Sequence, residues 1–160
     1  MTQGQPGRSL ILGLGNDLLG DDGVGFVIAR QAASQVPPTC DVVESGEAGL
    51  ALLELLADYE QAVILDSIQT GAEPGTIHKL SRDDFAKIVA PSAHYAGLPE
   101  VFDLGERIGV KLPSRLLVIA VEVEDPFSFS ETLTPKVENA VPAAVEEALE
   151  FLGLTRAALV

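Results

Sequence analysis

The stretch LILGLGNDLLGDDGVG, residues 10–25, decides the fold of this chain. An apolar run, Leu10–Leu12, leads into a glycine-rich turn, and two adjacent carboxylates, Asp21 and Asp22, precede a new amphipathic segment. This order predicts a buried parallel strand, a tight turn, an acidic loop and a helix. It places charged side chains at the carboxyl end of a strand, where open α/β sheets bind ligands.

The same stretch does not match the dinucleotide-binding pattern G-x-G-x-x-G. That pattern needs a third glycine where this chain has Leu18, and the nearby carboxylates would repel a pyrophosphate. A nucleotide-binding module is therefore disfavoured. Protection of the protein against heat by nucleotide would identify one.

Length and composition favour one acidic globular domain over residues 1–160, with a core at about residues 9–153 and flexible ends. The chain is 47% hydrophobic, and 10 Lys and Arg against 24 Asp and Glu give a net charge of -14. This charge disfavours nucleic acid and anionic membranes as partners. The lone Cys40 indicates a reducing cytoplasm, and no apolar window suits a signal peptide or a membrane span.

Strand and helix signals alternate along the chain, which predicts a three-layer α/β/α fold with a mostly parallel sheet. We expect strands near residues 10–12, 40–43, 62–65, 75–80 and 116–121. We expect helices near residues 24–32, 47–57, 83–89, 99–108 and 134–152. The weak alternation of residues 75–80 is typical of an edge strand. Pro142 should kink the last helix, at a cost of about 3 kcal/mol unless packing compensates.

Three side chains are candidates for chemistry at one rim of this sheet. Asp22 follows the first strand, Asp66 ends the third, and His94 lies in a loop before a later helix. Because βαβ crossovers are short and right-handed, we expect the first and third strands to be neighbours. Two carboxylates and an imidazole could bind a divalent metal with open positions, or do general acid–base work. Spacing alone does not choose between these roles.

Each candidate also has an ordinary structural interpretation. Asp21 or Asp22 could cap the helix that follows, and Asp66 could cap a turn. His94 could be a simple exposed loop residue, and His78, in the expected edge strand, is interpreted as structural or solvated.

Five motifs then stand in order along the chain. They are GLGNDLLGDDGVG at 13–25, ESGEAGL at 44–50, ILDSI at 64–68, SAHYAGLPE at 92–100 and ETLTP at 131–135. Together they resemble the hydrogenase maturation proteases, the endopeptidases that trim the large subunit of nickel-iron hydrogenases. The resemblance implies an α/β/α sandwich around a five-stranded sheet with one antiparallel strand, which suits residues 75–80 or the strand next to them.

The resemblance also implies that Asp22, Asp66 and His94 are the catalytic and metal-contacting residues. Relatives often have glutamate at the first position, and so direct contact of the shorter Asp22 with the metal, or contact through water, stays open. The segment 44–47 departs from the acidic-Gly-Gly-Thr form of several relatives. That loop is implicated in recognising the partner.

The activity implied by the resemblance is removal of a short C-terminal extension from a hydrogenase large-subunit precursor after nickel insertion. Nickel would be supplied by the substrate, and we expect a monomer with no permanent cofactor. A carboxylate could activate the attacking water, as in aspartic proteases, or nickel could assist hydrolysis. Cys40 lacks a positive neighbour to activate its thiol, which disfavours covalent catalysis. The alternative function is a non-catalytic nickel-binding or nickel-delivery protein for hydrogenase assembly.

Overall fold

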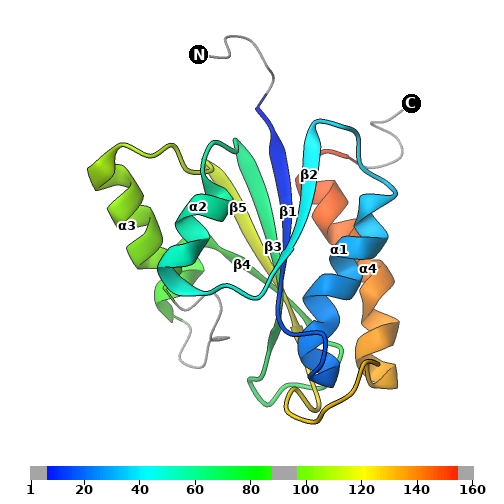
Figure 1. Cartoon of the computed structure of the whole chain (residues 1–160). Helices are drawn as coiled ribbons and strands as arrows, with labels where there is room; N and C mark the ends of the chain where they lie inside the picture. The colour runs from blue at the N-terminus through cyan, green and yellow to red at the C-terminus, as the bar shows by residue number, and fades with distance from the viewer. Residues whose placement is uncertain (1–6, 88–96, 155–160) are drawn as a thin grey trace.

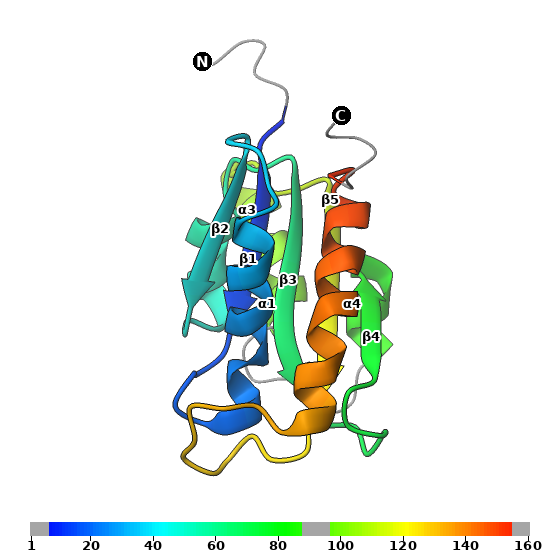
Figure 2. The same ribbon diagram turned by 90° about the vertical axis from the view of Figure 1, so that its right-hand side faces the viewer.

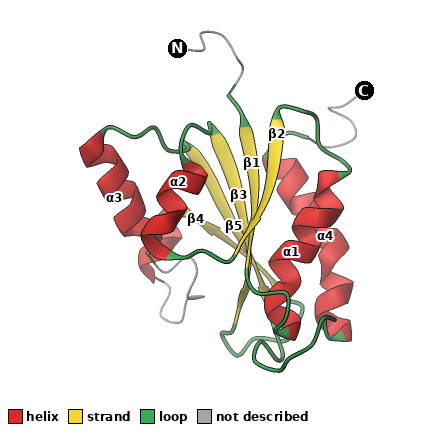
Figure 3. Cartoon of the chain, viewed as in Figure 1, coloured by secondary structure: helices red, strands yellow, loops and turns green. Residues whose placement is uncertain are grey.

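A five-stranded sheet in the order β2-β1-β3-β5-β4 forms the centre of the computed structural model, which describes residues 7–87 and 97–154 (Figures 1 and 3). Four strands are parallel: β1 (Ser9–Leu14), β2 (Cys40–Ser45), β3 (Gln61–Ile68) and β5 (Arg115–Glu122). β4 (Ile77–Ser81) is the edge strand and pairs antiparallel with β5. The predicted sheet, including its one antiparallel strand, is therefore confirmed.

Helices cover both faces of the sheet and give the predicted three layers (Figure 1). α1 (Val24–Ala33) and α4 (Pro135–Phe151) lie on one face, and α2 (Leu52–Leu56) and α3 (Leu98–Ile108) on the other. Short 3-10 helices are η1 (Gly20–Gly23), η2 (Gly49–Ala51) and η3 (Arg82–Lys87). Within the described ranges, no helix has the length and apolar character needed to cross a bilayer.

The alternation of side chains along β3 divides the core into two halves. Val63 and Leu65 pack with α1 and α4, whereas Ala62, Ile64 and Ile68 pack with α2 and α3. All four parallel strands end at one rim of the sheet, the lower end in Figure 2, which we call the carboxyl edge. Successive side chains near the end of β3 therefore point to opposite faces of the sheet at this edge.

Two glycines allow α1 to lie directly on the sheet. A Cβ atom on Gly25 would lie 2.4 Å from the carbonyl oxygen of Leu65 and 2.5 Å from that of Leu14. A Cβ atom on Gly13 would lie 2.7 Å from the carbonyl oxygen of Gly25. No side chain fits at such distances, and so glycine at both positions sets the close approach of α1 to β1 and β3. Asp22, just before α1, is held at the carboxyl edge by this contact.

The end of β3 differs from the prediction. The strand continues to Ile68, because Ser67 and Ile68 pair with Val121 and Glu122 of β5. Asp66 therefore lies within the strand and does not close it. The apolar run ends at Leu65, but backbone pairing with β5 does not depend on that run.

The start of one helix differs from the prediction, whereas the last helix has the predicted extent. The helix expected over residues 47–57 begins only at Gly49, because the backbone of Ala48 is extended, with φ -149° and ψ 165°. α4 continues through Pro142 as one helix of 17 residues. The ring of Pro142 is exposed, while the neighbouring Val141 and Ala144 are buried and hold the helix on the sheet.

Candidate functional site

Ser67 joins two of the predicted site carboxylates at the carboxyl edge. Its hydroxyl donates to Oδ1 of Asp22 at 2.8 Å, and its backbone N–H donates to Oδ1 of Asp66, also at 2.8 Å. β1 and β3 are neighbouring parallel strands, as the crossover argument predicted. The topology thus brings two acids from distant parts of the chain to the same serine.

The two carboxylates that bond to Ser67 differ in their burial and in their surroundings. Asp66 alternates with Ile64 and Ile68, which places it on the α2 and α3 face, while Ser67 alternates with Leu65 on the α1 and α4 face. Asp66 is fully buried, whereas Asp22 is partly exposed. Unlike surroundings are the condition under which two carboxylates take different acid–base roles.

His94, the third predicted site residue, lies outside the described residues. The described chain resumes at Gly97, where a Cβ atom would lie 3.4 Å from Cα of Gly49. A Cβ atom on Gly46 would lie 3.6 Å from the carbonyl oxygen of Gly15, which lies in the turn after β1. Residues 46–49 therefore run along the carboxyl edge, from the β1–α1 turn to the start of α3 (Figure 1).

The described part of the chain holds no group of three or more His, Cys, Asp or Glu side chains that could bind a metal ion. Asp22 and Asp66 supply two carboxylates, which are oxygen donors suited to a divalent cation. Each also bonds a different group of Ser67, Asp22 its hydroxyl and Asp66 its backbone N–H, and both acids stay candidates for the site.

Asp21 is a structural anchor that the sequence analysis did not identify. Its buried carboxylate accepts from the N–H groups of Glu124 at 3.0 Å, Asp125 at 3.2 Å and Thr134 at 2.8 Å. The Thr134 hydroxyl also donates to it, at 2.9 Å from Oδ2. Neither Asp21 nor Asp22 caps a helix, since no side-chain cap bond occurs at η1 or α1, and that interpretation was wrong.

Glu122 is a second buried carboxylate on the Asp66 face of the sheet. It is 1% exposed, accepts from the Thr70 N–H at 2.7 Å, and lies 3.1 Å from Nε2 of His78. Burial raises the pKa of Glu122, but hydrogen bonds from Thr70 and His78 outweigh it, and the net pKa is lowered. In register, Asp66 pairs with Ala120 and Ala120 with His78, so His78 lies across β5 from Asp66. His78 is thus bonded within the sheet, in line with its structural interpretation.

Cys40 has the properties of an inert core thiol. It is buried at the start of β2, the opposite end of the strand from the carboxyl edge. Burial, followed by the charge of Asp41, raises the pKa of the Cys40 thiol to about 11. Little thiolate is present at neutral pH, which agrees with the prediction that cysteine is not the nucleophile.

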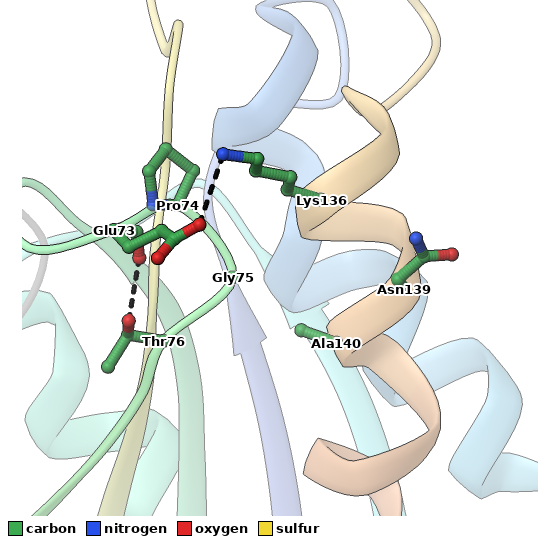
Figure 4. A pocket seen from close by; sticks show the side chains of 7 residues that line it. All are labelled: Glu73, Pro74, Gly75, Thr76, Lys136, Asn139 and Ala140. Carbon is green, nitrogen blue, oxygen red and sulfur yellow. Dashed lines mark hydrogen bonds and ion pairs between the residues drawn. The ribbon is translucent and has the colours of Figure 1, made fainter.

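Two cavities lie beside the N-terminal end of α4. One of about 310 Å³ lies under the β5–α4 loop, against Asp21 and Thr134. The other, of about 380 Å³, lies between the β3–β4 turn and α4 (Figure 4). Its charged groups neutralise each other, because Nζ of Lys136 lies 3.1 Å from Oε1 of Glu73. The second cavity therefore offers no free charge to a ligand.

Known proteins match most of this chain. The family model described as hydrogenase maturation protease matches residues 27–151. Hydrogenase expression/formation protein HupD of Rhizobium leguminosarum bv. viciae is 31% identical over 150 residues, covering 91% of this chain and 74% of that protein. The solved hydrogenase maturating endopeptidase HybD from E. coli has a TM-score of 0.78 at 29% identity, covering 91% of this chain and 92% of that one. The hydrogenase maturation protease HybD from Thermococcus kodakarensis has a TM-score of 0.72 at 30% identity, covering 89% and 97%.

Proposed function

The chain belongs to the hydrogenase maturation protease family, and on that premise we propose that it removes the C-terminal extension of a nickel-iron hydrogenase large-subunit precursor after nickel insertion. The observation that supports this proposal is the bond from the Ser67 hydroxyl to Asp22, which connects the loop after β1 to the residue next to Asp66. It supplies two acids in unlike surroundings at the edge of the sheet where α/β proteins bind substrates.

We assign the hydrolysis to Asp22 and Asp66, with His94 as the third member of the site. Asp66 is held by strand pairing and by the Ser67 N–H, and is the rigid member. Asp22 is partly exposed and can meet a substrate from solvent. One ionised carboxylate takes a proton from the attacking water, the tetrahedral intermediate collapses, and the same proton passes to the leaving amine.

Nickel enters this proposal as part of the substrate. Carboxylate oxygens and a neutral imidazole are donors that can complete the coordination of an ion already held by substrate thiolates. An ion in that position would polarise the scissile carbonyl and favour cleavage of loaded precursor. The protein acts here as a monomer without a permanent cofactor.

The test is incubation of purified protein with nickel-loaded and with nickel-free precursor, followed by mass spectrometry of the large subunit. The proposal predicts that the loaded precursor loses its C-terminal extension and that the nickel-free form is cut much more slowly. Equal cutting of both forms would contradict nickel recognition. Binding or delivery of nickel without any shortening would favour the nickel-delivery function instead.

A further inference from the structure

Three large apolar side chains are exposed on the two loops next to Asp22. Leu18 in the β1–α1 loop is 54% exposed, and Phe127 and Phe129 in the β5–α4 loop are 75% and 87% exposed. Single exposed apolar residues are ordinary, but two largely exposed phenylalanines on a loop that is hydrogen-bonded to the loop of Leu18 favour a partner. We call Leu18, Phe127 and Phe129 the loop patch.

The loop patch is held in place by hydrogen bonds between the two loops. The N–H of Ser130 donates to the Leu18 carbonyl at 3.0 Å, and the N–H of Gly20 donates to the Ser130 carbonyl at 2.8 Å. Oδ1 of Asp125 accepts from the N–H of Phe127 at 3.0 Å, while buried Asp21 holds both ends of the β5–α4 loop. A surface ordered in advance loses little conformational entropy when a partner binds.

The patch is continuous with the candidate site. The N–H of Asp22 donates to the carbonyl of Leu19 at 3.1 Å, so the loop that carries Leu18 also carries the site carboxylate. A chain seated on the patch would therefore lie next to the loop that carries Asp22. This continuity connects the patch to the substrate of the site.

Charge indicates the chemistry of the partner. Glu124 and Glu131, in the same loop as the two phenylalanines, are exposed, and the whole chain has a net charge of -14. An apolar centre with an acidic rim complements a segment that carries apolar residues next to Lys or Arg, and it repels an acidic one.

We propose that the loop patch is the docking surface for the hydrogenase large-subunit precursor, binding an apolar segment flanked by basic residues close to the bond that is cut. The identity of this partner rests on the proposed function. The patch would set the affinity for precursor, while Asp22 and Asp66 carry out the cleavage.

The test compares a Phe127→Ser/Phe129→Ser variant with the matched control Ile108→Ser. Ile108 is 57% exposed and ends α3, away from the loop patch. We expect KM for nickel-loaded precursor to rise roughly tenfold or more in the double variant, because aromatic anchors dominate interfaces. We expect kcat and the thermal midpoint to stay near wild type, and the control to keep the wild-type KM.

A second arm tests the acidic rim. Glu124→Gln/Glu131→Gln should weaken the rise of KM with salt that the wild-type protein is expected to show. An unchanged KM in the double phenylalanine variant, or a wild-type dimer that the variant loses in sedimentation, would overturn the docking surface.

These outcomes are distinct from failure of the proposed function. A wild-type protein that leaves loaded precursor uncut contradicts the proposed function itself. Direct binding of uncut precursor to the wild-type protein and to the double variant then still tests the patch, since equal affinities would overturn it.

Discussion

The hydroxyl of Ser67 donates to Oδ1 of Asp22 at 2.8 Å, and this bond connects the loop after β1 to the end of β3. The N–H of the same serine donates to Asp66. Ser67 therefore contacts both acids of the candidate site, a role that the motif ILDSI at 64–68 contains but does not reveal.

Ser67→Ala should lower kcat for precursor cleavage by roughly tenfold to a hundredfold, because Asp22 loses the bond that orients it. The folded state should lose only about 1 kcal/mol, since the Ser67 N–H still donates to Asp66. Steady-state kinetics and urea unfolding measure the two effects. Ser67→Thr keeps a hydroxyl and should restore much of the activity, and full activity in Ser67→Ala would show that Asp22 needs no such support.

Asp21→Ala should destabilise the fold by roughly 1–3 kcal/mol, because it leaves the part-buried N–H groups of Glu124, Asp125 and Thr134 without their acceptor. Urea unfolding followed by circular dichroism checks this value. Asp17→Ala is the matched control, since Asp17 is exposed and its bond to Arg30 is long, at 3.4 Å. Equal stability of the two variants would refute the anchoring role of Asp21.

Gly25→Ala should destabilise the protein by roughly 1–3 kcal/mol or more and reduce activity, because the new methyl group would meet two backbone carbonyls of the sheet. Thermal unfolding and the cleavage assay measure both losses. Gly46→Ala adds the same methyl group at an ordinary 3.6 Å contact and should be tolerated. If both variants behave alike, the close seating of α1 does not position Asp22.

Glu122 should make stability depend on pH in the acid range. Its pKa in the folded protein lies below the ordinary 4.5, so its stabilising contribution is complete above the unfolded pKa and is lost as pH falls through the folded one. Glu122→Gln should be less stable than wild type at neutral pH but lose less stability between about pH 5 and pH 3. Unfolding midpoints across that range test this, and parallel curves would exclude Glu122 as a source of the dependence.

Much of the fold could be predicted because apolar runs indicate buried strands and glycines indicate tight turns. Leu10–Leu12 indicated β1, and the handedness of crossovers placed β1 next to β3. The end of β3 could not be predicted, because Ser67 and Ile68 are held by pairing with β5, which lies far along the chain.

The site, too, could be predicted only in part, because some of its contacts join residues that are far apart in the chain. Asp22 and Asp66 could be identified from their positions after apolar runs, and the structure brings both to Ser67. The anchoring role of Asp21 depends on partners more than 100 positions away, at Glu124, Asp125 and Thr134, and no local pattern specifies such contacts. His94 lies outside the described residues, and its role stays a prediction from the family motif.

The most direct test of the account is the cleavage of nickel-loaded precursor by Asp66→Asn, with Glu146→Gln on the exposed side of α4 as the matched acid control. Asp66→Asn keeps the shape of the side chain and removes its charge and its capacity to accept a proton. We predict a folded protein with the wild-type unfolding profile that leaves the precursor at full length, while the control cuts it at the wild-type rate. Near-normal processing by Asp66→Asn would contradict the assignment of the site.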